Sequence, residues 1–134
     1  MIRATLDTNI WLSSILWTGR PYWIRKAIEG KEFISVTSLK ILNELTRVLR
    51  EYFQFSDDDA YEWYLRVGEM SEVLSPKLTL NLIEDDPDDN KFVECALEGR
   101  ARYVVTRDRH LLKVKEYEGV RMVDDGKFIG ILKG

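Results

Sequence analysis

Short apolar runs alternate along the chain with longer stretches whose apolar residues recur at helical spacing. The short runs are almost continuously apolar, which is typical of strands that are buried on both faces of a parallel sheet. They cover residues 2–6, 33–36, 72–74, 103–105 and 120–123. Strands that alternate with helices at these lengths predict βαβ units with right-handed crossovers. The pattern therefore predicts an α/β fold, a three-layer α/β/α sandwich.

The stretches between these runs carry recognisable helix starts. Pro21 suits the first turn of a helix, and Ser38 and Ser56 suit the N-caps of two further helices. Asp59 lies three residues after Ser56, which is the spacing of a capping box. The predicted helices cover 10–16, 21–29, 38–50, 56–70 and 90–99, with a short one within 106–112.

Two segments are predicted to lie outside the helices and strands. Residues 84–90, EDDPDDN, are expected to form a loop because Pro87 bars regular structure. Asp125-Gly126 predicts a turn before an apolar tail at 128–132. Three acids of the first segment are interpreted as solvated loop residues: Asp85, Asp86 and Asp88.

Four carboxylates stand where chain elements begin or end. Asp7 directly follows the first strand, Asp108 follows the fourth by three residues, and Asp89 begins the helix that leads into the fourth strand. The carboxyl ends of parallel strands meet at one edge of the sheet, which is where ligands bind in open α/β folds. Glu44 lies about 40° around its helix from Val48, beside the apolar stripe. All four are therefore expected at one rim.

Carboxylates that lie together repel one another, and each makes the next harder to ionise. A compensating cation makes such a cluster tolerable, and ligands that offer only oxygen favour Mg²⁺ or Mn²⁺. Such an ion lowers the pKa of a bound water and stabilises charge on phosphate oxygens. The four acids therefore predict metal-dependent phosphate chemistry.

Simpler interpretations exist for single acids. Asp89 and Asp108 suit helix N-caps, a position that aspartate favours. Glu44 alone suits a solvated residue at the boundary of a helix face. Asp7 is harder to explain in this way, because charges are seldom placed unpaired at the end of a buried strand.

Composition narrows the class of protein. A length of 134 residues predicts one domain, 1–134, and no stretch approaches the ~20 apolar residues of a membrane span. The single cysteine, Cys95, excludes an internal disulfide, suits buried packing and favours a reducing cytoplasm. The single histidine, His110, excludes zinc sites of the HExxH type and paired-histidine acid–base chemistry. The net charge of −3 argues against nucleic-acid binding by bulk charge, but it does not exclude a nuclease.

The segments LDTNIWLSSILW, SLKILNELTRVL and DPDDNKFVECALEGRARYVVTRDRHLL resemble a PIN domain. The likeness extends over nearly the whole chain and is greatest to the prokaryotic VapC-like toxins of toxin–antitoxin pairs. It implies a five-stranded parallel sheet in the order 3-2-1-4-5 and Mg²⁺- or Mn²⁺-dependent cleavage of RNA. It also implies a homodimer and a small antitoxin protein as partner.

The resemblance assigns roles by position. Six residues match the family's pattern, the first four as its acidic quartet and the last two as supporting polar residues: Asp7, Glu44, Asp89, Asp108, Asn9 and Thr106. Arg107 departs from the pattern, because the family has a small residue there. Cations beside the rim are expected to meet RNA phosphates: Lys91, Arg107 and Arg109. For His110, a surface or capping role is as good an interpretation as contact with RNA.

An unusually rich set of aromatic residues favours a shared surface, either a dimer face or an antitoxin groove. It comprises Trp11, Trp17, Tyr22, Trp23, Trp63 and Tyr64. Two rival functions remain. One is a PIN-like module that binds RNA or protein without cutting, although a pure binder has no need of the quartet's repulsion. The other is a phospho-aspartyl receiver or phosphatase, but Asn9 occupies the second acidic position of the phosphatase pattern.

Overall fold

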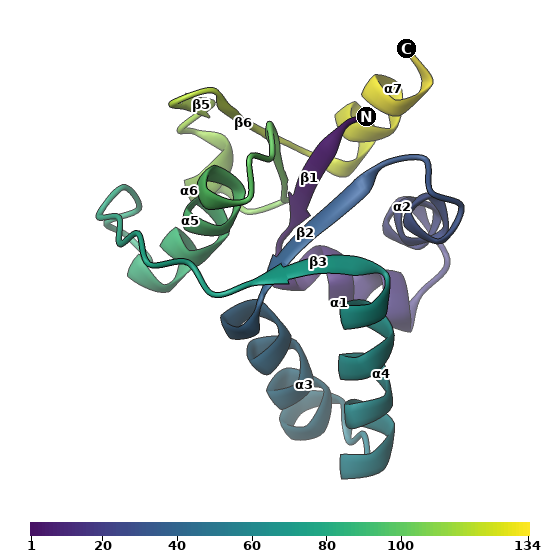
Figure 1. The fold of residues 1–134 in the computed structure, drawn as a ribbon. Coiled ribbons are helices and arrows are strands. Elements are labelled where there is room, and N and C mark those ends of the chain that lie inside the picture. The colour runs from purple at the N-terminus through teal and green to yellow at the C-terminus, as the bar shows by residue number, and fades with distance from the viewer.

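The computed structural model describes residues 1–134, and a six-stranded sheet in the order β3-β2-β1-β4-β6-β5 forms its middle layer (Figure 1). Neighbouring strands are parallel except β5, which runs antiparallel to β6. The strands are β1 Arg3–Leu6, β2 Ile34–Ser38, β3 Ser71–Leu74, β4 Tyr103–Val105, β5 Glu116–Tyr117 and β6 Val120–Val123. The five parallel strands are those predicted, in the predicted order.

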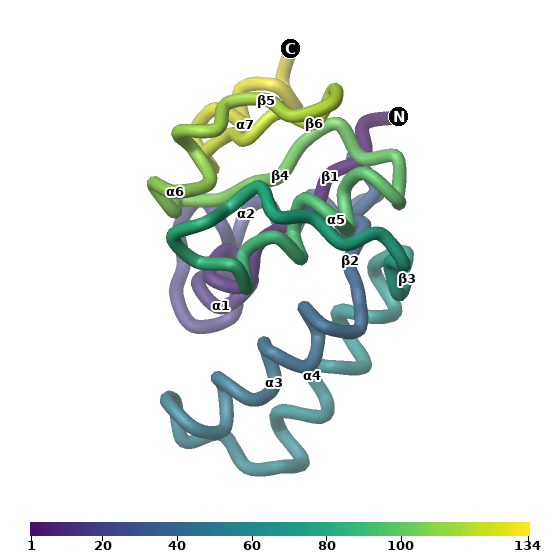
Figure 2. The backbone as a smooth tube through the Cα atoms, turned by 90° about the vertical axis from the view of Figure 1, so that its left-hand side faces the viewer, coloured from purple at the N-terminus to yellow at the C-terminus, as the bar shows by residue number.

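Helices lie on both sides of this sheet, which confirms the three-layer arrangement. They are α1 Thr8–Leu16, α2 Arg20–Glu29, α3 Leu39–Phe53, α4 Asp57–Glu69, α5 Asn90–Glu98, α6 Arg109–Leu112 and α7 Asp125–Lys133, with a 3-10 turn at Pro87–Asp89. In Figure 1, α5 and α6 lie on one side of the strands and α1, α2 and α7 on the other. Figure 2 shows that α3 and α4 form a side-by-side pair that extends away from the sheet.

Two details differ from the prediction. The sheet has a sixth strand, the two-residue β5, because the chain turns through left-handed conformations at Lys115, Glu118 and Gly119 and folds back on β6. The turn and tail predicted from Asp125-Gly126 are instead the helix α7. Its N-cap is Asp124, whose Oδ1 accepts from Lys127 N at 2.7 Å. Phe128 is fully buried with its ring centroid 5.0 Å from that of Phe33, so tertiary packing overrides the local turn signal.

The two predicted serine caps are present. Ser38 Oγ accepts from Ile41 N at 3.3 Å, and Ser56 Oγ accepts from Asp59 N at 3.1 Å. The helix that Ser38 begins runs past the predicted end to Phe53, where Gln54 adopts φ 61° and stops it. The Ser38 cap fixes where α3 starts, and the Ser56 cap fixes where α4 starts.

The core lies between the layers and contains 29 buried apolar residues in one cluster. Cys95 is part of it, and burial raises the pKa of its thiol to about 12, so the predicted packing role is confirmed. None of the helices combines the length and the apolar composition that crossing a bilayer requires. In Figure 1, β1 runs downward from the N-terminus, so its carboxyl end lies on the side from which α3 extends.

Candidate active site

A pocket of about 200 Å³ lies where β1 ends and α1 and α5 begin, beside the middle of α3. Its ten lining residues include all four acids of the predicted quartet: Asp7, Thr8, Asn9, Glu44, Val48, Asp86, Asp88, Asp89, Phe92 and Asp108. Six of these ten are carboxylates, and we call this the carboxylate pocket. The sheet topology thus gathers acids from four separate segments of the chain, three of them beside a strand end or helix start and Glu44 beside the apolar stripe of α3, as predicted.

Asp7 is the most buried of these acids, with 3% of its surface exposed. Its Oδ1 accepts from Ile10 N at 2.8 Å, which makes Asp7 the N-cap of α1, and its Oδ2 accepts from Thr106 Oγ1 at 2.5 Å. Burial raises the pKa of Asp7 to about 6 against these hydrogen bonds, and the charges of Asp108 and Glu44 raise it further. Hydrogen bonds therefore hold Asp7 in place, and its ionised form costs folding free energy because it is buried.

Thr106 links Asp7 to Asp108. Its Oγ1 donates to Asp7 and accepts from Asp108 N at 2.9 Å. Asp108 Oδ1 accepts from His110 N at 2.7 Å and from Leu111 N at 3.4 Å, so the N-cap interpretation of Asp108 holds while it also lines the pocket. The buried threonine sets the spacing of two acids that come from different strands.

Asp89 stands at the start of α5 but does not cap it, because its side chain makes no capping hydrogen bond. Its Oδ2 is buried without any hydrogen-bond partner. Burial raises the pKa of Asp89 to about 7, and the charges of Asp86, Asp108 and Asp7 act in the same direction. A buried carboxylate oxygen without a donor is costly, and it is the natural partner of a cation.

Glu44 reaches the pocket from α3, and both its oxygens have protein partners. Thr8 Oγ1 donates to Oε1, and Lys91 Nζ donates to Oε2 at 3.0 Å. Lys91 also donates to Asp88 Oδ2 at 2.5 Å, and this hydrogen bond holds the pKa of Asp88 below its usual range. The side chain of Lys91 is only 7% exposed. Lys91 is therefore an internal cation between two pocket acids, whereas the sequence suggested a lysine on the rim that faces substrate.

The remaining predicted residues lie around the mouth of the pocket. Asn9 is exposed and lines the pocket. Arg107 forms a two-pronged pair with Asp125 at the start of α7, with Nε to Oδ1 3.2 Å and Nη2 to Oδ2 2.5 Å. Arg109 is exposed in the first turn of α6. His110 lies between two acids, 3.7 Å from Asp108 and 3.9 Å from Asp85.

Sequence reasoning missed three polar residues of the pocket. Thr8, Asp86 and Asp88 line it, and the latter two were interpreted as solvated loop acids. Asp86 and Asp88 reach the pocket because of the 3-10 turn at Pro87–Asp89, which directly precedes α5. The hydrogen bond from Thr8 to Glu44 joins residues 36 positions apart, and no local pattern announces it.

The residues present fit a hard divalent cation by donor type, because the pocket offers carboxylate oxygens and one of them is buried without a partner. Burial is the main cause of the raised pKa values of Asp7 and Asp89, and the charges of neighbouring acids raise them further. The side chains do not form a closed cage, since no group of three or more acidic, histidine or cysteine residues is arranged closely enough to hold a metal ion. Glu44 in particular is tied to Thr8 and Lys91.

Comparison with solved structures places the fold among known ones. The crystal structure of PAE2754 from Pyrobaculum aerophilum matches with a TM-score of 0.63 at 17% identity, over 98% of this chain and 97% of that one. VapBC2 from Rickettsia felis, bound to a DNA fragment from its promoter, matches with a TM-score of 0.65 at 13% identity, over 92% and 98%. VapBC-1 from nontypeable Haemophilus influenzae matches with a TM-score of 0.61 at 19% identity, over 93% and 99%. At these identities the likeness concerns the fold.

Sequence comparison is more specific. An uncharacterized protein of Methanocaldococcus jannaschii is 27% identical over 121 residues, which is 86% of this chain and 76% of that protein. The sequence profile of the PIN domain matches residues 3–110, a span that contains every residue of the carboxylate pocket. This chain belongs to the PIN domain family.

Proposed function

We propose that this protein is a ribonuclease that hydrolyses RNA phosphodiester bonds with the help of Mg²⁺ or Mn²⁺, and that it is the toxin of a toxin–antitoxin pair. PIN domains are generally nucleases, and the structural neighbours include VapBC proteins. The observation that carries the proposal is the convergence of four acids from separate segments on one pocket: Asp7, Glu44, Asp89 and Asp108.

The same four acids would hold the ion, with Asp7 and Asp108 as its direct ligands. A bound divalent cation supplies two things to hydrolysis: a water of lowered pKa and stabilisation of the charge that develops on the phosphate. Asp89 Oδ2 is buried without a hydrogen-bond donor, so a cation in the pocket would satisfy it. An oxygen-only donor set also explains the choice of Mg²⁺ or Mn²⁺ over zinc.

The chain's own residues hold this arrangement in place. Thr106 and the start of α1 fix both oxygens of Asp7, so the carboxylate cannot turn away when RNA enters. Lys91 holds Glu44 and offsets part of the negative charge of the pocket. Around the mouth, the exposed side chains of Asn9 and Arg109 are available to RNA phosphates.

Arg107 stands where the family's pattern has a small residue. Its pairing with Asp125 holds the guanidinium beside the first turn of α7. The side chain remains 53% exposed, so it can contact an RNA phosphate without leaving Asp125. Arg107 thus serves as a fixed positive group at the rim.

One observation favours a second function, a PIN-like module that binds RNA or protein without cutting it. Both oxygens of Glu44 are engaged by Thr8 and Lys91, and no closed cage of ligands is present. A site of this kind would need to rearrange around an ion. The two functions differ in one outcome, since only the nuclease converts RNA to shorter products when metal is added.

Incubation of the purified protein with structured and unstructured RNA, with and without Mg²⁺ or Mn²⁺, tests the proposal. The expected result is cleavage that requires the added ion and that EDTA abolishes. Binding without cleavage at any concentration of either ion would favour the second function. Formation of an acyl-phosphate on Asp7 would indicate phosphotransfer chemistry instead.

An exposed aromatic surface supports the proposed dimer or antitoxin contact. Trp17 and Trp23 are 60% and 61% exposed, and the Trp17 ring meets Phe53 of α3 edge to face at 6.3 Å. Trp11 belongs to the core, so the aromatic set is divided between inside and outside. Exposed aromatics of this size are enriched at protein interfaces. Light scattering is expected to give about twice the 15.7 kDa chain mass. A clean monomer would leave these rings to an antitoxin.

A further inference from the structure

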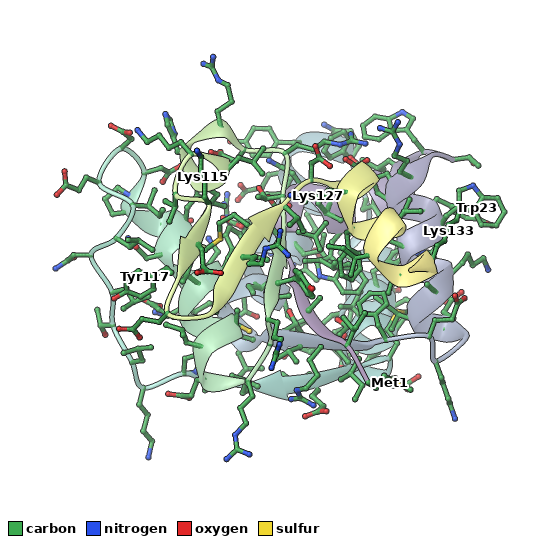
Figure 3. The ribbon with its side chains drawn as sticks, turned by 90° about the horizontal axis from the view of Figure 1, so that it is seen from above. Met1, Trp23, Lys115, Tyr117, Lys127 and Lys133 are labelled. Carbon is green, nitrogen blue, oxygen red and sulfur yellow. The ribbon has the colours of Figure 1, made fainter.

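A group of arginines stands at the edge of the sheet opposite the carboxylate pocket. Arg102 N donates to Arg3 O at 3.1 Å, and Arg121 N donates to Arg102 O at 2.8 Å, so three arginines from three segments are backbone neighbours. A fourth lies two residues before Arg102. We call these four residues the arginine edge: Arg3, Arg100, Arg102 and Arg121. Figure 3 looks onto this end of the molecule, with Met1 labelled just before β1 and Tyr117 across from it.

A hollow of about 460 Å³ at this edge is lined by arginines and contains no carboxylate. Its lining is Met1, Ile2, Arg3, Arg100, Arg102 and Tyr103. A second hollow of about 540 Å³ shares Arg100, Arg102 and Tyr103 with the first, and its lining also includes Arg121, Glu116 and Glu118. The two hollows therefore form one basic surface around Tyr103.

Most of this positive charge has no partner within the chain. Arg3 is paired with Glu72 through two hydrogen bonds of 2.7 and 3.0 Å. Arg100, Arg102 and Arg121 take part in no salt bridge, and Arg121 lies over the Tyr103 ring at 6.0 Å from its centroid. Three unpaired arginines stand together in a protein whose net charge is −3. A surface with free guanidinium groups suits an anionic ligand.

The backbone conformation at Arg100 decides which substitution removes its side chain without strain. Arg100 has φ 57°, the left-handed conformation that ends α5, where glycine is the usual residue. The glycine of this turn stands one position earlier instead, because a Cβ at Gly99 would come within 2.3 Å of Val36 Cγ1. The chain thus carries an arginine where glycine would be less strained. Lys31 adopts the same conformation, so the conformation alone assigns no function to Arg100, but it means that replacing Arg100 with glycine relieves backbone strain.

We propose that the arginine edge binds the phosphodiester backbone of RNA. The identity of the ligand rests on the proposed ribonuclease function. Arginine matches phosphate oxygens with paired N–H groups, and open hollows that spread several arginines suit a polymer better than one enclosed small anion. The arginine edge would also attract RNA to an acidic protein whose carboxylate pocket repels it.

The two sites are close enough for one RNA molecule to occupy both. Arg3 and Asp7 stand at opposite ends of β1, about 13 Å apart through the sheet at ~3.3 Å per residue, and an RNA strand connects them by the longer path over the surface. A trinucleotide in the carboxylate pocket does not extend around the molecule to the other edge, whereas a long single strand does. The arginine edge therefore increases affinity for long RNA and leaves the cleavage of very short RNA unchanged.

Fluorescence anisotropy with a long single-stranded RNA, in EDTA so that no cleavage occurs, tests this proposal. The test variant combines Arg100→Gly, which relieves the left-handed backbone, with Arg102→Ala. We expect binding to weaken about tenfold and the salt slope of log K to shrink by about 1.4, which is ~0.7 per lost phosphate contact. Lys31→Gly is the control for Arg100→Gly alone, since each removes one positive charge at a left-handed position, but Lys31, with φ 59°, lines neither hollow.

Two results with the variants would overturn the proposal: a double variant that binds long RNA like the wild type, or a Lys31→Gly variant that loses as much affinity as the double variant. Full competition by inorganic phosphate at the concentration of RNA phosphate would also overturn it, because a small-anion site would then be present. Metal-dependent cleavage of a trinucleotide is measured separately. Its absence in the wild type contradicts the nuclease proposal alone, while a failed anisotropy result contradicts only the arginine edge.

Discussion

The two edges of the sheet carry opposite charge, and they differ in how many of their charged groups have partners within the chain. At the carboxyl edge, six acids line one pocket, and half of their oxygens accept hydrogen bonds from Thr106, Thr8, Lys91 or backbone N–H groups. At the opposite edge, three arginines stand without ionic partners. At the first edge, hydrogen bonds hold charged groups in place although their burial costs folding free energy. At the second edge, the charged groups are free to contact a ligand. The net charge of −3 conceals this separation.

The comparison leads to an expectation about function. A pocket whose acids are held rigidly suits chemistry, because catalysis depends on groups that are already in place. A surface of free arginines suits capture, because contacts to phosphates supply affinity without fixed geometry. Changes at the carboxyl edge are therefore expected to alter cleavage and stability, while changes at the arginine edge alter affinity for long RNA.

The largest expected effect follows from Asp7→Asn. Cleavage is expected to fall by more than about 100-fold, because even residues that only support a metal's ligands cost 10- to 100-fold when changed. Asparagine keeps a capping oxygen for Ile10 N, so the fold is retained. Stability without metal should rise by about 2 kcal/mol at neutral pH, since the replaced carboxylate is buried and its pKa is raised to about 6. Cleavage assays and thermal melts measure both. Wild-type cleavage by this variant would remove Asp7 from the site.

Lys91→Met tests the internal cation of the carboxylate pocket. Removal of a nearly buried ammonium leaves Glu44 and Asp88 without their partner, and we expect a loss of about 2 kcal/mol in unfolding free energy without metal. The stabilisation by Mn²⁺ should then exceed that of the wild type, because the pocket is more negative. Lys91→Arg serves as the control that keeps the charge. Equal stabilisation by Mn²⁺ in Lys91→Met and the wild type would show that Lys91 does not compete with the ion.

The pH dependence of stability separates the pocket from an ordinary acidic surface. The pKa of Asp7 is raised to about 6 and that of Asp89 to about 7, so the folded state binds these protons more tightly than the unfolded chain. Their contribution to stability is complete below about pH 4 and is lost as the pH rises through about 7. The unfolding free energy without metal should therefore fall by about 1–2 kcal/mol between about pH 5.5 and 8. Urea titrations would measure it, and Asp7→Asn should show a smaller fall.

The smallest effect is expected for Thr106→Val, which keeps the shape of the side chain but removes its hydroxyl. Asp7 Oδ2 then loses its donor and Asp108 N its acceptor. Cleavage should fall about tenfold, at the lower end of the range for residues that support metal ligands. Thr46→Val, on a buried hydroxyl that bonds only within α3, is the matched control and should leave cleavage unchanged. An equal loss in both variants would point to general destabilisation.

The strands and the four acids could be predicted from the sequence because each is associated with a local sequence pattern. A short apolar run predicts a buried strand, and the acid beside its end then falls at a known edge. Lys91 has no such pattern: it follows Asn90 on α5, and only the fold brings Glu44 within 3.0 Å of it. The same holds for Thr8 and for the arginine edge, whose members come from β1, β6 and the turn before β4.

The helix α7 was missed for a related reason. Asp125-Gly126 is a strong local turn signal, and the helix depends on Phe128 reaching Phe33 and Tyr103 in the core. Arg107 adds to this, because its pairing with Asp125 fixes the first turn of α7. Contacts between segments distant in sequence therefore stabilise α7, and local propensity does not predict such contacts.

The most direct test of the carboxylate pocket is the melting temperature of metal-stripped protein as Mn²⁺ is added. An ion that binds only the folded state stabilises it by about 2.7 kcal/mol at a concentration 100 times its Kd, so the melting temperature should rise by several degrees. Asp108→Asn keeps a side chain able to cap α6 and should respond much less. A wild-type melting temperature that does not change at saturating Mn²⁺ would contradict a metal site in this pocket.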